Sequence, residues 1–128
     1  MRILFDTHTL IWFLSDSPHL TPQARGLLSR EGVEIFFSPI SIEEIAIKHS
    51  LKPEVMPCEP SEVLADALAS GLREIPFDAQ AAVAVGALPW IHRDPFDRML
   101  IAQAQTASMK LLSHDANVLR YGDVAIGF

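Results

Sequence analysis

Four acidic side chains, widely separated in the sequence, are the residues of this chain best suited to act together chemically. Asp6 and Asp115 each follow a short apolar run. Glu44 and Asp97 each lie near the start of a predicted helix. Carboxylate oxygens are the ligands that Mg²⁺ and Mn²⁺ prefer, with waters completing the coordination. We therefore predict that these four carboxylates converge on one site for Mg²⁺ or Mn²⁺.

Each of these acids also has a purely structural interpretation. Asp6 and Asp115 could cap the helices that follow them, and Asp97 could complement the positive end of its helix. Glu44 stands three residues after Ser41, which is the spacing of a capping box. The shared site is favoured because carboxylates gathered at one edge of a sheet would repel one another, and a divalent cation removes that repulsion.

Basic residues and one further acid lie close in sequence to the predicted ligands. Lys48, Arg93 and Arg98 could form ordinary salt bridges, or could hold a phosphate backbone at the mouth of the site. Asp94 precedes Pro95 and is predicted to cap a helix, with an auxiliary role at the metal as the alternative.

Three histidines, His8, His92 and His114, each lie within two residues of a candidate acid. Zinc sites use His and Cys ligands at recognisable spacings, and no such spacing is present. We therefore expect surface or supporting roles for these imidazoles rather than direct metal ligation.

The elements that must position these residues alternate between strands and helices. Apolar runs typical of buried strands cover residues 2–5, 34–38, 73–75, 110–112 and 124–126. Helical patterns cover residues 7–15, 21–30, 41–48, 61–71, 78–87, 94–107 and 115–119. Such alternation predicts an α/β fold with a parallel sheet covered on both faces, and ligands of such sheets bind beyond the carboxyl ends of the strands.

Length and composition indicate one globular domain over residues 1–128. Apolar residues make up 49% and charged residues 20% of the chain. The single cysteine, Cys58, excludes an internal disulfide framework. No apolar stretch is long enough to span a bilayer and no signal peptide is recognisable, so we expect a soluble, cytoplasmic protein. The net charge of −6 argues against general adhesion to nucleic acid, but not against a nuclease whose bound cations reverse the local charge.

Four sequence runs contain the predicted acids and their neighbours: FDTHTLIW at 5–12, SPISIEEIAIK at 38–48, HRDPFDRMLIAQA at 92–104 and LLSHD at 111–115. These runs resemble those of PIN-domain ribonuclease toxins of the VapC type. The third run is the most specific of them, and together they span almost the whole chain. Two departures from the family pattern are Glu43, where a tryptophan is common, and Ser113, where a threonine is common.

The resemblance implies a single PIN domain with a three-layer α/β/α sandwich around a central parallel sheet. It implies a Mg²⁺- or Mn²⁺-dependent endoribonuclease acting on structured RNA such as tRNA or rRNA, with Asp6, Glu44, Asp97 and Asp115 as the acidic quartet. It also implies a homodimer and a cognate antitoxin of a type II toxin–antitoxin pair. Ser113 keeps the hydroxyl of the family threonine and is expected to support the site.

Two other functions compete with this interpretation. The same fold could bind RNA or an antitoxin without cutting, and could keep its acids as a structural cation site. A phospho-acceptor receiver domain also groups acids at strand ends, but it needs a partnering lysine there, and Lys110 lies at the start of a strand. No Ser/His/Asp or Cys/His arrangement is evident, so hydrolysis would use metal-activated water.

Overall fold

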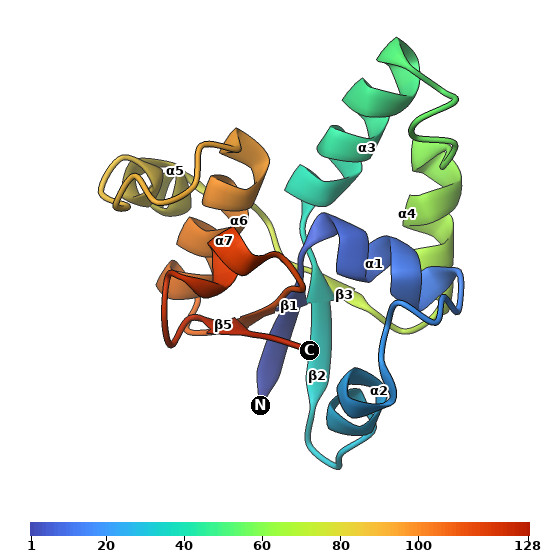
Figure 1. Cartoon of the computed structure of the whole chain (residues 1–128), viewed down its shortest axis with the longest axis horizontal. Coiled ribbons are helices and arrows are strands. Elements are labelled where there is room, and N and C mark those ends of the chain that lie inside the picture. Colours follow the sequence, from blue (N-terminus) through green and yellow to red (C-terminus); the bar gives the residue numbers. More distant parts are fainter.

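Five short strands form one parallel sheet in the computed structural model, which describes residues 1–128 (Figure 1). The strands are β1 (Arg2–Phe5), β2 (Glu34–Phe37), β3 (Arg73–Glu74), β4 (Lys110–Leu112) and β5 (Ala125–Ile126). Their order across the sheet is β3-β2-β1-β4-β5, and every neighbouring pair is parallel. The chain direction across the sheet therefore reverses between β1 and β4, and ligands of open α/β sheets bind at such a switch point.

Seven helices cover the two faces of this sheet. They are α1 (Thr7–Leu14), α2 (Pro22–Leu28), α3 (Pro39–Leu51), α4 (Pro60–Ala69), α5 (Ala79–Val85), α6 (Pro95–Thr106) and α7 (Ala116–Leu119). Figure 1 shows α1, α3 and α4 on one side of the sheet and α5, α6 and α7 on the other. This arrangement confirms the predicted three-layer α/β/α sandwich with a central parallel sheet.

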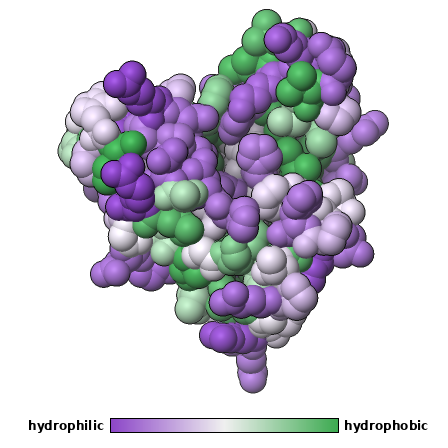
Figure 2. All heavy atoms as spheres, in the orientation of Figure 1, coloured by the Kyte–Doolittle hydropathy of each residue, from purple (hydrophilic) through white to green (hydrophobic).

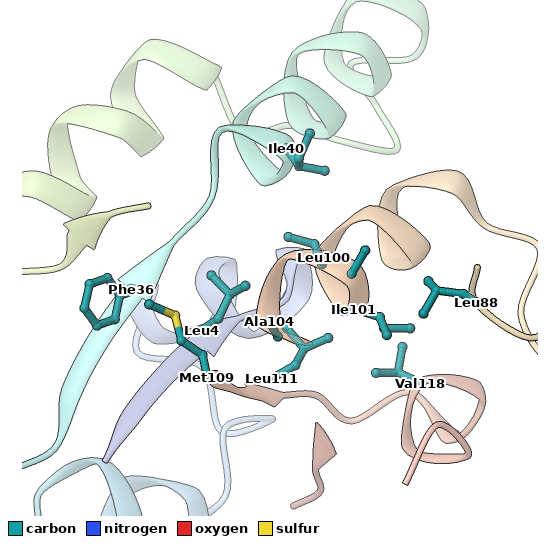
Figure 3. Packing of buried hydrophobic residues seen from close by; sticks show 11 residues of the cluster. Leu4, Phe36, Ile40, Leu88, Leu100, Ile101, Ala104, Met109, Leu111 and Val118 are labelled. Atoms are coloured by element: carbon teal, nitrogen blue, oxygen red, sulfur yellow. The ribbon is translucent and has the colours of Figure 1, made fainter. Parts of the chain in front are cut away.

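Successive strand residues point to opposite faces of the sheet and so build two separate cores. On β1, Leu4 belongs to one buried cluster, whereas Ile3 and Phe5 belong to the other. Leu111 and Leu112 divide in the same way on β4. Figure 3 shows the first cluster, in which the strand residues meet a row of apolar side chains from α6: Leu100, Ile101 and Ala104. Burial on both faces explains why these strands are continuous apolar runs rather than alternating ones.

Four helices begin with proline directly after a capping side chain. The pairs are Thr21-Pro22, Ser38-Pro39, Glu59-Pro60 and Asp94-Pro95. The structure corrects the predicted helix start at residue 41: α3 begins at Pro39 and is capped by Ser38, and α4 begins at Pro60 and is capped by Glu59. The alternative interpretation of Ser41 and Glu44 as a capping box is therefore wrong, because proline is pre-organised for the first helical position and sets the start of α3 earlier. Glu44 is thereby freed from a capping role.

The surface is mostly hydrophilic and is hollowed on one side. Figure 2 shows a notch between α3 and the side formed by α5 and α6, bordered mainly by hydrophilic residues. Apolar residues gather at the outer end of α3 and the turn after it, where Ile47, Leu51 and Val55 are exposed (Figure 2). No helix has the length and apolar character needed to cross a membrane.

Candidate metal centre

The four predicted acids lie at the edge of the sheet where the parallel strands end. Asp6 follows β1 and Asp115 follows β4, so both lie at the switch point. Asp97 lies in the first turn of α6, and Asp6, Asp97 and Asp115 line one open pocket. Glu44 does not line this pocket, but its negative charge, like that of Asp6, acts to raise the pKa of Asp97. The structure therefore brings Asp6, Asp97 and Asp115 together at one pocket, with Glu44 nearby on α3.

Asp6 acts both as a helix cap and as a side chain of the pocket. Its Oδ1 accepts a hydrogen bond of 2.9 Å from the Thr9 N–H, and its Oδ2 accepts one of 2.5 Å from the Ser113 hydroxyl. Ser113 Oγ in turn accepts a 3.1 Å hydrogen bond from the Asp115 N–H. Ser113, predicted as a supporting residue, thus joins the ends of β1 and β4. Burial raises the pKa of Asp6 despite these hydrogen bonds.

Glu44, rather than Glu43, points into the protein. Glu44 is buried and Glu43 is exposed. Its Oε1 accepts a 2.6 Å hydrogen bond from the Thr7 hydroxyl, and its Oε2 lies 2.5 Å from Lys48 Nζ. The hydrogen bond to Glu44 raises the pKa of Lys48. Sequence reasoning missed Thr7, although its position directly after Asp6 was available as a signal.

The surroundings of Asp97 strongly raise the pKa of its carboxyl. Its side chain is only 16% exposed, and Nε2 of His92 lies 2.8 Å from its Oδ2. Burial, followed by the negative charge of Asp94, raises the pKa of Asp97 to about 7, although the hydrogen bond from His92 opposes the change. The site therefore holds more negative charge than its own donors neutralise. Such a set of hard oxygen donors fits Mg²⁺ or Mn²⁺.

His92, which was expected to have a supporting role, lies directly beside two of the acids, Asp97 and Asp115. Its Nδ1 accepts a 3.1 Å hydrogen bond from the Arg93 N–H, so in the neutral ring Nε2 carries the proton and donates it to Asp97. The same Nε2 lies 3.6 Å from Oδ2 of Asp115, whose side chain is 41% exposed. One potential ligand atom from each of His92, Asp97 and Asp115 lies within 4.8 Å of the others. This histidine therefore links two of the acids.

Arg98 is held inside the protein and is not available to a phosphate. It is 2% exposed, and its guanidinium stacks on the Trp90 ring at 3.8 Å. It also donates to the Tyr121 hydroxyl at 3.2 Å. Its other acceptors are the carbonyl oxygens of Val85, Leu88, Pro89 and His92. This burial contradicts the predicted contact between Arg98 and a phosphate backbone. Both terminal nitrogens of the guanidinium already donate hydrogen bonds to acceptors inside the protein.

The other predicted neighbours lie beside the acids. The Lys48 side chain is 41% exposed and pairs with Glu44, and Arg93 is exposed. Asp94 caps α6, accepting hydrogen bonds of 2.9 Å and 3.3 Å from the N–H groups of Phe96 and Asp97. The cap prediction for Asp94 is confirmed, and its charge still acts on the site through Asp97.

Comparison with known proteins assigns the fold to one family. The PIN domain family pattern matches residues 3–124. No curated protein matches the sequence significantly. Among solved structures, the chain resembles VapBC2 from Rickettsia felis bound to a DNA fragment from their promoter, with a TM-score of 0.72, 17% identity, and coverage of 100% of this chain and 99% of that chain. It also resembles DNA-bound VapBC from Salmonella typhimurium, with a TM-score of 0.66, 18% identity, and coverage of 99% and 98%.

A third similar structure is FitAcB from Neisseria gonorrhoeae, with a TM-score of 0.58, 22% identity, and coverage of 98% of this chain and 96% of that chain. Structural matches at identities this low establish only a shared fold. Membership in the family is established by the PIN domain pattern, which covers nearly the entire sequence. The acidic edge of the sheet lies within the matched residues. The chain belongs to the PIN-domain family.

Proposed function

We propose that this PIN domain is a divalent-metal-dependent endoribonuclease and the toxin of a type II toxin–antitoxin pair. The observation that carries the proposal is the meeting of Asp6, Asp97 and Asp115 in one pocket at the switch point of the sheet, with the negative charge of Glu44 acting on Asp97 and the pKa of Asp97 raised to about 7. PIN domains are generally nucleases, and perturbed carboxyls grouped in a pocket are typical of functional sites.

Asp6, Asp97 and Asp115 would hold the cation from the pocket, and Glu44 would complete the acidic group from α3. The chemistry that a divalent cation supplies when bound is activation of water and neutralisation of charge on the scissile phosphate. No side chain of the site is arranged as a nucleophile with its own base, so hydrolysis by water is the reaction that this donor set supports.

The surrounding side chains keep the acids in position. Ser113 orients Asp6, Thr7 and Lys48 orient Glu44, and His92 orients Asp97. Fixing carboxylate orientation in this way preserves the geometry of a metal site. Lys48 and Arg93 remain the candidate contacts to RNA phosphates, since Lys48 pairs with Glu44 and is partly exposed, and Arg93 is exposed and follows His92 in the sequence.

The solved structures that this chain resembles include VapBC-1 from Haemophilus influenzae and a toxin–antitoxin complex from Klebsiella pneumoniae. On that likeness we propose a cognate antitoxin as the protein partner, a homodimer as the active form and the cytoplasm as the location. Structured RNA such as tRNA or rRNA is the proposed substrate.

The decisive experiment incubates purified protein with total RNA, with and without Mn²⁺, beside the variant Asp97→Asn. Wild-type protein is expected to cut RNA only with Mn²⁺, and the variant is expected to be at least about a hundredfold slower, because it loses a carboxylate that positions the cation. Equal behaviour of the two proteins with Mn²⁺ would refute the enzymatic proposal and favour a module that binds RNA or antitoxin without cutting.

A further inference from the structure

The pocket that contains the acids has a second wall made of aromatic rings. His8, Trp12 and His114 line it together with Asp6, Asp97 and Asp115. The Trp12 ring lies 5.8 Å from the His8 ring and 6.0 Å from the His114 ring, measured between centroids. His8 and His114 are both exposed. We refer to His8, Trp12 and His114 as the aromatic wall.

The rings of the aromatic wall lie close to one another and to two further rings outside the pocket, His19 and Phe128. His8 and Trp12 are four residues apart on α1, which puts their rings on one face of the helix. The His19 ring stacks on Trp12 at 5.1 Å but does not line the pocket. His114 donates from Nδ1 to the Phe128 carbonyl oxygen over 2.5 Å, and the Phe128 ring lies 6.1 Å from Trp12. The wall is therefore a set of neighbouring rings that face the pocket.

The charges around the pocket decide what this wall can bind. The lining contains three carboxylates and neither lysine nor arginine, and the whole chain has a net charge of −6. A nucleic-acid strand entering here gains little from attraction between its phosphates and the wall. Stacking of a base on an aromatic or imidazole ring needs no net charge, and it tolerates any base because every base has a π-face.

We infer that the aromatic wall takes one unpaired nucleobase of the RNA substrate, next to the acids that would act on its phosphate. The inference rests on the proposed nuclease function and narrows its substrate class to RNA with an accessible, unstacked base beside the cleaved bond. Bases inside an intact duplex are stacked on their neighbours and cannot present a face to the wall.

Fluorescence anisotropy with a labelled single-stranded RNA tests the inference, with Ca²⁺ in place of Mn²⁺ and a gel to verify that the RNA stays intact. The comparison RNAs are the same strand with one abasic position and a blunt duplex of equal length. The variants are His8→Ala, His114→Ala and the double variant, with His8→Phe as a replacement that preserves stacking. His19→Ala is the matched control, because it removes an exposed ring on Trp12 that does not line the pocket.

We expect the double variant to bind the intact strand about tenfold more weakly than wild-type protein does. We expect wild-type protein to bind the abasic strand about tenfold more weakly than the intact strand. Loss of one stacked base gives an effect of this size. His8→Phe and His19→Ala are expected to bind like wild type, and the duplex is expected to bind worst. Equal binding of intact and abasic RNA, or an unaffected double variant, would overturn the inference even if the protein cuts RNA. Base-dependent binding without cleavage in Mn²⁺ would instead refute the nuclease function, and absence of any RNA binding would refute both.

Discussion

The hydroxyl of Tyr121 lies 3.2 Å from Nη1 of Arg98 and joins the segment after α7 to the loop before α6. The same hydroxyl accepts a 3.1 Å hydrogen bond from the His92 N–H and donates a 2.8 Å hydrogen bond to the Pro89 carbonyl. Arg98 contacts further carbonyls of that loop from inside α6. Together, Arg98 and Tyr121 hold the loop that brings His92 to the acids.

Tyr121→Phe removes only this hydroxyl and leaves the ring. We expect a loss of about 1–3 kcal/mol in the free energy of unfolding, because the His92 N–H and one Arg98 donor lose their acceptor. We also expect severalfold weaker Mn²⁺ binding, since His92 would no longer be fixed beside Asp97. Urea unfolding and calorimetric titration with Mn²⁺ measure the two effects. Unchanged metal affinity would mean that the loop contact serves stability alone.

Arg98→Lys keeps the charge but cannot reach the same acceptors. A lysine has three donors on one nitrogen, whereas the guanidinium contacts four carbonyls and the Tyr121 hydroxyl in a fixed plane. We expect a loss of at least about 2 kcal/mol in the free energy of unfolding. Arg93→Lys is the matched control and should change stability by less than about 0.5 kcal/mol, because Arg93 is exposed. Comparable losses in the two variants would contradict the structural role of Arg98.

Thr7→Val removes a hydroxyl that donates to Glu44 while keeping the shape of the side chain. Thr106→Val is the control, because it removes a hydroxyl that donates a 3.1 Å hydrogen bond to the Ala102 carbonyl within α6 and not to an acid. Thr7→Val should lose about 1–3 kcal/mol of unfolding free energy because its hydroxyl is buried, whereas Thr106→Val should lose less because Thr106 is exposed. Only Thr7→Val should also weaken Mn²⁺ binding, measured as a smaller rise in melting temperature on adding the metal. A similar loss of metal response in both would argue that Glu44 plays no special part at the site.

The raised pKa of Asp97 makes stability depend on pH in a definite direction. Between the ordinary value of 3.8 and about 7, the folded protein keeps a proton that the unfolded chain has released. Stability present at low pH is therefore lost as the pH rises through this range. In EDTA, the contribution of Asp97 should lower the melting temperature as the pH rises from about 5 to about 7.5. Asp97→Asn should flatten this dependence, because the amide does not titrate.

The same linkage predicts how a cation acts at different pH. At pH 5 a metal ion must displace the proton of Asp97, whereas at pH 7.5 much of that carboxyl is already ionised. Mg²⁺ should therefore raise the melting temperature more at pH 7.5 than at pH 5. A response that is equal at the two values, or larger at pH 5, would place the bound cation away from Asp97.

Local patterns in the sequence were sufficient for the strands and for several helix starts. The predicted strand at residues 110–112 is β4, and Thr21, Asp78 and Asp94, the first residues of three predicted helices, all accept hydrogen bonds from backbone N–H groups two or three residues later. These features depend on interactions between residues a few positions apart, and they can therefore be predicted from short windows. The helices predicted to start at residues 41 and 61 begin instead at Pro39 and Pro60, where proline occupies the first helical position.

The sequence by itself determined the α/β class, the order of the elements and the placement of the four acids at strand ends and helix starts. Only the tertiary structure decided which atoms meet: Thr7 with Glu44, Ser113 with Asp6, and Arg98 with the loop that carries His92. The first two contacts join residues 37 and 107 positions apart. The parallel sheet creates these contacts by bringing the ends of distant strands to one edge, and burial then decides which polar groups must pair.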